Sequence, residues 1–244
     1  MQIEIYNTEQ ESGRAAAKHA TQLLRKTIEV NGIANIILAT GTSQFEILDQ
    51  LISEDIDWSK VTMFHLDEYI GLPVTHPASF RKYLQERFIS KVRLKEVYLI
   101  NGETDPQHEC ERLNELILQY PVDVALTGIG ENGHLAFNDP PADFETDQPY
   151  IVVELDNACR QQQMNEGWFN SLDDVPSKAI SMSIRQIMRS KNIVCSVPGK
   201  RKATAVKNCL EHAVTNLYPA SILQSHHNCI VYLDKDSASL LRNK

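Results

Sequence analysis

Short apolar runs alternate along this chain with segments of helical periodicity, and this alternation constrains the fold more than any other feature. Runs such as Ile36-Ile37-Leu38 are apolar at successive positions, which is typical of strands covered by helices on both faces. Strands alternating with helices predict a three-layer α/β fold with a Rossmann-like, doubly wound and mostly parallel sheet. The predicted strands are residues 3–6, 33–40, 61–67, 97–100, 122–128, 150–155, 178–184, 192–199 and 229–234.

Helices are predicted in most of the gaps between these strands. The segment 8–29 carries alanine, leucine and isoleucine at helical spacing, and a second helix is predicted over 44–52. A third begins at Pro106, directly after the capping residue Asp105, and is expected to run to Tyr120. No internal repeat and no linker rich in Pro, Gly or Ser divides the chain, so we expect a single domain over the whole of it, residues 1–244.

Composition and charge limit the partners and the location. A net charge of −8 disfavours nucleic acid, whose phosphates are bound by clustered Lys and Arg. The N-terminus lacks the apolar core of a signal peptide, and no apolar run approaches the roughly 20 residues that cross a bilayer, so we expect a cytoplasmic protein without membrane contact. Five cysteines without a C-x-x-C pair favour free thiols. A homo-oligomer is compatible with all of these features.

Two loops after predicted strands have the character of an anion site. Ligands of open α/β sheets bind beyond the carboxyl ends of strands, so these loops are where a site is expected. The segment TGTS at 40–43 offers backbone N–H groups and hydroxyls just before a helix, a geometry that holds phosphate. The segment KRK at 200–202 also precedes a helix, where its charge opposes the helix dipole. An anion is therefore expected to compensate it.

The third loop contains GIGENG at 128–133, a formal match to G-x-G-x-x-G after a strand. A dinucleotide fingerprint opens a long helix, whereas Pro140 and Pro141 would end any helix shortly after these glycines. The glycines instead let the backbone approach a ligand, while His134, flanked by Glu131 and Asp139, is a candidate for proton chemistry.

The fourth loop, LDEYIGLP at 66–73, places Asp67 and Glu68 at the end of a predicted strand. Because Gly71 and Pro73 follow at once, no helix begins there for these acids to cap. A partly desolvated carboxylate at the edge of a sheet is suited to act as a carbon-acid base. No metal-binding or activated-nucleophile motif is present, so the four loops predict a site for proton transfer on a small phosphorylated molecule.

The segments LDEYIGLP followed by HPASF, GIGENGHLAFNDP and GKRKA resemble, in this order and over nearly the whole chain, the glucosamine-6-phosphate deaminase (isomerase) family. The resemblance implies a modified Rossmann-like sheet shared with 6-phosphogluconolactonases and ribose-5-phosphate isomerases. It also implies a reaction that converts glucosamine 6-phosphate and water to fructose 6-phosphate and ammonia, without a cofactor or a metal.

The same resemblance assigns roles to residues of this chain. Asp67 corresponds to the base that moves a proton between C2 and C1, and His134 to the group that opens the pyranose ring. Asp139 takes the place of a glutamate that orients this histidine, and Asn132 stands where many members have aspartate. The residues implied to bind phosphate or substrate are Thr40, Gly41, Thr42, Ser43, Glu68, Gly130, Gly133, Arg160 and Lys202.

Two departures from the family pattern concern the phosphate. A side chain at Thr42 replaces a glycine of the usual loop. The segment 157–169 is about two residues longer than usual, which leaves Arg160 as the candidate for the family's phosphate arginine.

Three alternatives remain open from the sequence. The substrate could be galactosamine 6-phosphate, which differs at one hydroxyl, or the enzyme could be a 6-phosphogluconolactonase. A third alternative is a non-catalytic sugar-phosphate sensor, which is disfavoured because the chain keeps both Asp67 and His134 and has no added DNA-binding segment.

Overall fold

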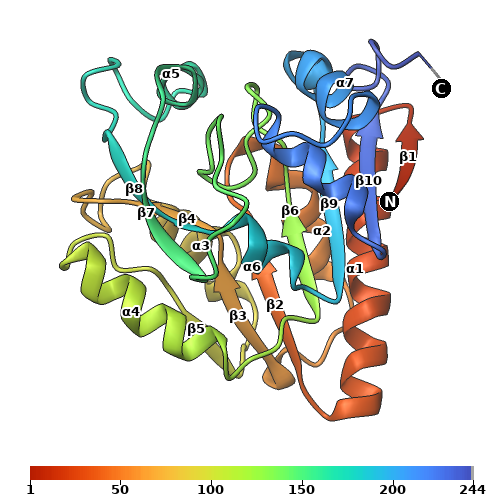
Figure 1. Ribbon diagram of the computed structural model, residues 1–244. Coiled ribbons are helices and arrows are strands. Elements are labelled where there is room, and N and C mark those ends of the chain that lie inside the picture. The colour runs from red at the N-terminus through yellow and green to blue at the C-terminus, as the bar shows by residue number, and fades with distance from the viewer. Residues whose placement is uncertain (243–244) are drawn as a thin grey trace.

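The computed structural model describes residues 1–242 and contains two β-sheets (Figure 1). The larger sheet has seven strands, all parallel, in the order β1-β10-β9-β6-β2-β3-β5. The smaller sheet is antiparallel, in the order β4-β8-β7. The strands are β1 (Gln2–Tyr6), β2 (Ala34–Leu38), β3 (Val61–His65), β4 (Asp67–Tyr69), β5 (Glu96–Tyr98), β6 (Val124–Thr127), β7 (Tyr150–Glu154), β8 (Lys178–Met182), β9 (Asn192–Val197) and β10 (Cys229–Asp234).

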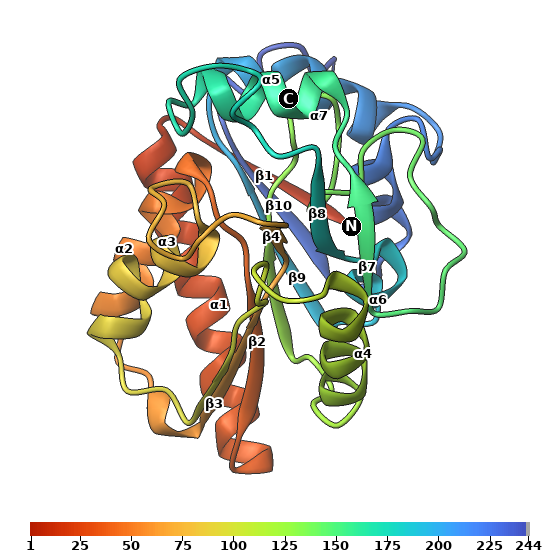
Figure 2. The same ribbon diagram turned by 90° about the vertical axis from the view of Figure 1, so that its left-hand side faces the viewer.

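Helices cover both faces of the larger sheet, which confirms the predicted three-layer α/β fold (Figure 2). Apolar residues of α1, α2 and α3 pack on one face, and those of α4, α6 and α7 pack with the small sheet on the other. The helices are α1 (Glu9–Asn31), α2 (Phe45–Ser53), α3 (Phe80–Arg87), α4 (Pro106–Ile117), α5 (Asn157–Asn165), α6 (Ile184–Met188) and α7 (Ala203–Glu211). Short 3₁₀ turns are η1 (Thr42–Gln44), η2 (Trp58–Lys60), η3 (Ile89–Lys91), η4 (Lys200–Lys202) and η5 (Pro219–Ser225).

Local sequence signals explain where two of the predicted helices begin and end. The hydroxyl of Thr8 accepts a hydrogen bond from the Glu11 N–H at 3.2 Å, and α1 ends at Gly32, whose φ of 80° few other residues adopt readily. The carboxylate of Asp105 accepts from the His108 N–H at 2.9 Å and starts α4 at Pro106, as predicted.

The predicted membership of the sheets is wrong in one region. Residues 61–67 form two strands instead of one, because the chain leaves the larger sheet at Leu66, whose carbonyl accepts from the Met182 N–H at 2.6 Å. Asp67 then pairs with Ser181 of β8. The predicted strands at 150–155 and 178–184 exist as β7 and β8, but they belong to the antiparallel sheet. Sequence pattern alone cannot distinguish a short buried strand of one sheet from that of another.

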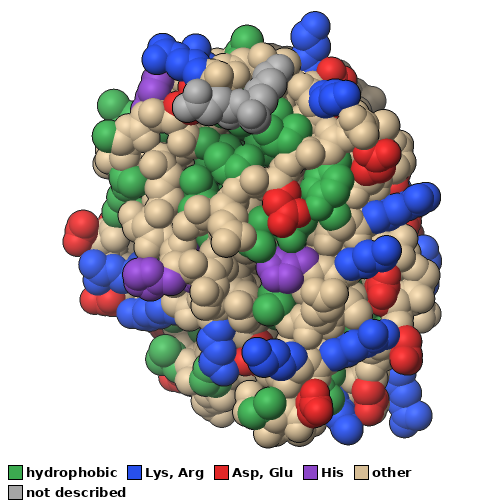
Figure 3. All heavy atoms as spheres, turned by 90° about the vertical axis from the view of Figure 1, so that its right-hand side faces the viewer, with side chains coloured by type: hydrophobic (Ala, Val, Ile, Leu, Met, Phe, Trp, Pro, Cys, Tyr) green, Lys and Arg blue, Asp and Glu red, His purple; other side chains and the backbone are tan. Residues whose placement is uncertain are grey.

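Both sheets contribute to one hydrophobic cluster, in which Ile180 of β8 and Ile193 of β9 take part. The single domain over residues 1–244 stays a prediction, and Asn243 and Lys244 at its end lie outside the described residues. Ile3 and Ile5 of β1, the edge strand of the larger sheet, are exposed. Figure 3 shows hydrophobic side chains among charged ones on the side of the molecule where β1 lies in Figure 1. No helix in residues 1–242 has the length and apolar character that a membrane span requires. The homo-oligomer stays a prediction.

Candidate active site

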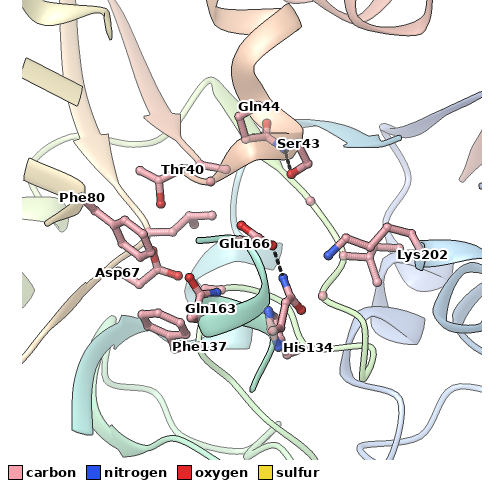
Figure 4. Close-up of a pocket in the computed structure, with 18 residues that line it drawn as sticks. Thr40, Ser43, Gln44, Asp67, Phe80, His134, Phe137, Gln163, Glu166 and Lys202 are labelled. Atoms are coloured by element: carbon pink, nitrogen blue, oxygen red, sulfur yellow. Dashed lines mark hydrogen bonds between the residues drawn. The ribbon is translucent and has the colours of Figure 1, made fainter. Parts of the chain in front are cut away.

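A pocket lies at the carboxyl ends of the central strands (Figure 4). The loops after β2, β3, β6 and β9 meet there, as expected for an open α/β sheet. Seven of the predicted site residues line this pocket: Thr40, Gly41, Ser43, Asp67, Gly130, His134 and Lys202. Six others do not: Thr42, Glu68, Asn132, Gly133, Asp139 and Arg160.

Asp67 lies at the first position of β4, where its side chain faces the pocket. It is 6% exposed, and no donor within residues 1–242 forms a hydrogen bond with its carboxylate. Burial, with a smaller contribution from the charge of Glu68, raises the pKa of Asp67 to about 8. A carboxyl group with this pKa is available near neutral pH both to accept and to return a proton.

Glu68 points to the opposite side of β4 and does not reach the pocket. Its carboxylate accepts hydrogen bonds from the Ser79 hydroxyl at 2.9 Å and from the Phe80 and Arg81 N–H groups at 3.2 and 2.8 Å. These donors belong to the first turn of α3, so Glu68 caps that helix from a distance. This corrects two expectations: that Glu68 binds substrate, and that the acids of this loop have no helix to cap.

His134 is held against Asp139, with 3.1 Å between its Nδ1 and the Asp139 Oδ1. Burial alone would raise the pKa of Asp139, but the hydrogen bond and charge of His134, together with the Asn132 amide and the Asp156 N–H, bring it below its ordinary value. The ring is in place only because residue 130 is glycine, since a Cβ there would lie 2.2 Å from the His134 Nε2. Gly130 therefore acts by making room for the imidazole.

Asn132 and Gly133 support this arrangement without lining the pocket. The Asn132 side-chain amide donates to Asp139 Oδ1 at 2.9 Å, and its oxygen accepts from the His134 N–H at 3.0 Å. Asn132 thus fixes the backbone of His134 and its carboxylate partner, and it does not form a hydrogen bond with the ring in the described residues. Gly133 has a φ of 89°, a conformation that glycine adopts without strain.

The predicted anion loop forms the 3₁₀ turn η1, in which alternate residues point in different directions. Thr40, Gly41 and Ser43 line the pocket, whereas Thr42 does not, and its hydroxyl donates to Glu166 Oε2 at 3.4 Å. Opposite this turn, Lys202 enters the pocket from η4 (Figure 4). Burial lowers the pKa of Lys202, and the charge of Glu166 acts against this.

Arg160 is not a phosphate ligand in this structure. Its guanidinium donates to the carbonyls of Leu172 and Val175 at 2.7 and 3.0 Å, and so ties α5 to the segment that follows. The pocket residues that α5 does supply are Gln162 and Gln163, with Glu166 at its C-terminal end. Sequence reasoning missed all three. The available signal was the capping Asp156 followed by a polar run, which is compatible with a short helix.

One group of three or more His, Cys and acidic side chains in residues 1–242 is compact enough to consider as metal ligands. The ligand atoms of His134, Asp139 and Cys159 lie within 4.8 Å of one another. Asp139, however, already accepts from Asn132 and from the Asp156 N–H. Burial also raises the pKa of Cys159 well above its usual range, which disfavours the thiolate that binds metals. The group is therefore an acid and an imidazole 3.1 Å apart, with a thiol beside them.

Comparison with known proteins identifies the family to which this chain is similar. Residues 7–232 match the family described as glucosamine-6-phosphate isomerases/6-phosphogluconolactonase. The glucosamine-6-phosphate deaminase of Oenococcus oeni is 38% identical, with all of both chains covered, and that of Listeria welshimeri is 37% identical, with 95% of this chain and 97% of the relative covered.

Solved structures agree with the sequence comparisons. A monomeric glucosamine-6-phosphate deaminase superposes with a TM-score of 0.89 at 33% identity, over 98% of this chain and 100% of the other. A 6-phosphogluconolactonase from Trypanosoma brucei superposes with a TM-score of 0.82 at 17% identity, over 98% of both chains, which is a likeness of fold alone. The chain therefore belongs to the family of glucosamine-6-phosphate isomerases and 6-phosphogluconolactonases.

Proposed function

We propose that this protein is a glucosamine-6-phosphate deaminase, which converts glucosamine 6-phosphate and water to fructose 6-phosphate and ammonia. The convergence of Asp67, His134 and Lys202 on one pocket carries the proposal, because it joins two proton-transfer groups to a buried cation. Support also comes from the deaminases that are 37–38% identical over nearly the whole chain. The substrate is a small sugar phosphate, and a cytoplasmic location stays a prediction.

His134 opens the sugar ring in this proposal. Its Nδ1 faces Asp139, which leaves Nε2 as the nitrogen that exchanges a proton with the substrate. The imidazole moves the proton of the anomeric hydroxyl to the ring oxygen, and the open-chain aldehyde results. The Asp139 carboxylate favours the charged form of the ring during this transfer.

Asp67 then moves a proton along the carbon chain. Its carboxylate removes the proton from C2 of the aldehyde and returns it to C1 through an enol-type intermediate. A second proton passes from the amino nitrogen to O1, which leaves a hydroxyl at C1 and an imine at C2. Water adds to this imine, and ammonia departs with formation of the C2 ketone. A carboxyl with a pKa near 8 suits both halves of this transfer, since it is neither a strong acid nor fully ionised at neutral pH.

The opposite end of the pocket binds the phosphate in this proposal. Thr40, Gly41 and Ser43 offer hydroxyl and backbone donors, and Lys202 supplies a buried ammonium. Burial strengthens the attraction between Lys202 and an anion, because water does not screen it there.

An assay of ammonia release tests the function. Purified protein is given glucosamine 6-phosphate and galactosamine 6-phosphate in parallel, and hydrolysis of 6-phosphogluconolactone is followed separately. We expect ammonia and fructose 6-phosphate from the first substrate. Faster release from galactosamine 6-phosphate would reassign the epimer, and lactone hydrolysis without ammonia would identify a lactonase. Sugar-phosphate binding without any turnover would indicate a sensor.

A further inference from the structure

The buried cation of the pocket faces an acid supplied by the protein itself. Glu166 lines the pocket together with Lys202 (Figure 4). Its carboxylate lies beside the anion loop, where it accepts from the Thr42 hydroxyl at 3.4 Å. Among the described charges, Glu166 has the largest effect on the pKa of Lys202. A negative charge was expected near the basic cluster at 200–202, and the carboxylate of Glu166 supplies part of it.

The carboxylate of Glu166 is held in place by several donors. The Gln162 amide donates to Oε1 at 2.8 Å, and the Trp168 indole N–H donates to Oε2 at 3.3 Å. Glu166 also caps the C-terminal end of α5, where the helix dipole disfavours a negative charge. Three donors thus hold the Glu166 carboxylate in the wall of the pocket, although the helix dipole disfavours its charge there.

Of the two acids that act on Lys202, only Glu166 lines the pocket. The other acid that acts on Lys202, Glu131, pairs with Arg201 at 3.4 Å and does not line the pocket. At the anion end of the pocket, the positive charge of Lys202 is thus opposed by Glu166, which lines the same pocket and would also repel a phosphate bound there. A phosphate monoester has a second pKa near 6, so it carries almost two charges at neutral pH.

We propose that Glu166 is a specificity-determining residue, because its negative charge offsets the positive charge of Lys202. It weakens the binding of a doubly charged phosphate relative to sugar end groups that carry less charge or that can donate a hydrogen bond to a carboxylate. This inference rests on the proposed function for the placement of the phosphate. It names the favoured ligand class as sugars whose end group both accepts from an ammonium and donates to an acid, such as a singly charged phosphate ester.

The test compares Glu166→Gln with the wild-type protein and with Glu131→Gln as the matched control. Both variants remove one negative charge that acts on Lys202, but only residue 166 lines the pocket. Glutamine keeps an oxygen that accepts hydrogen bonds. Binding of glucose 6-phosphate is measured by calorimetry at pH 8, where the ester is a dianion, and a thermal melt checks that each variant is folded.

We expect Glu166→Gln to bind glucose 6-phosphate about tenfold more tightly than the wild type, since one repulsive charge is removed from a half-buried site. Glu131→Gln should gain clearly less. Unchanged or weaker binding in folded Glu166→Gln would overturn the proposal, as would equal gains in both variants or no binding by any of the three proteins. The readout needs no turnover, so a failed ammonia assay would refute the proposed function without deciding this result.

Discussion

The two faces of β4 treat adjacent carboxylates in opposite ways. Asp67 on the pocket face is 6% exposed and has no hydrogen-bond donor among residues 1–242, whereas Glu68 on the helix face is fully buried and accepts from Ser79, Phe80 and Arg81. Burial raises the pKa of both acids, but for Glu68 the donors of α3 act against it. The comparison teaches that burial alone does not distinguish a structural acid from a reactive one. The absence of hydrogen-bond donors distinguishes the reactive acid from the structural one.

The largest effect on stability is expected on the helix face. Glu68→Gln removes the charge that faces Arg81 Nε at 3.3 Å and places an NH₂ group among donors, so the free energy of unfolding should fall by about 3 kcal/mol. Glu103→Gln is the control, because Glu103 also pairs with Arg81, at 2.9 Å, but is 42% exposed, and it should cost less than about 1 kcal/mol. Urea denaturation measures both. Equal losses would mean that Glu68 does not organise α3.

On the pocket face, replacing the acid is expected to increase the free energy of unfolding. The pKa of Asp67 is about 8 in the folded protein and about 4 in the unfolded chain, so its cost to stability is absent below pH 4 and grows as the pH rises to 8. Asp67→Asn should therefore raise the free energy of unfolding by up to about 5 kcal/mol at pH 8 and leave it nearly unchanged at pH 4.

A matched substitution sharpens this second prediction. Asp123 is also buried but accepts from the Asn35 N–H and the Lys191 ammonium, both at 2.8 Å. Asp123→Asn should therefore destabilise the fold at pH 8 in the same denaturation experiment. Destabilisation by Asp67→Asn as well would show that Asp67 has stabilising partners after all.

A smaller effect is expected in the pH dependence of the reaction. Because Asp67 must be ionised to remove a proton from C2, kcat/KM for glucosamine 6-phosphate should rise about tenfold per pH unit below pH 8 and level off above it. Initial rates from pH 6 to 9 measure this profile. A flat profile between pH 6 and 8 would contradict a raised pKa at the reacting carboxylate.

The sequence predicted the four loops because their signals are local. Glycines, strand ends and the basic cluster at 200–202 identify them without knowledge of the fold. The role of Glu68 could not be predicted, since Ser79, the first residue of the helix cap that it contacts, lies eleven residues later and only tertiary structure brings them together. The same holds for α5, because the position of Glu166 over the pocket depends on how that helix packs. Within η1, the 3₁₀ geometry decides that Ser43 and not Thr42 faces the ligand.

The central claim is that the partnerless carboxylate of Asp67 is the base of a single pocket that also binds the sugar phosphate. Single-turnover and steady-state ammonia release by Asp67→Asn test it most directly, with calorimetric titration of glucose 6-phosphate as the control for binding. The account predicts a loss of about 10³-fold in turnover with affinity changed by less than about threefold. A folded Asp67→Asn protein that releases ammonia at the wild-type rate would contradict it.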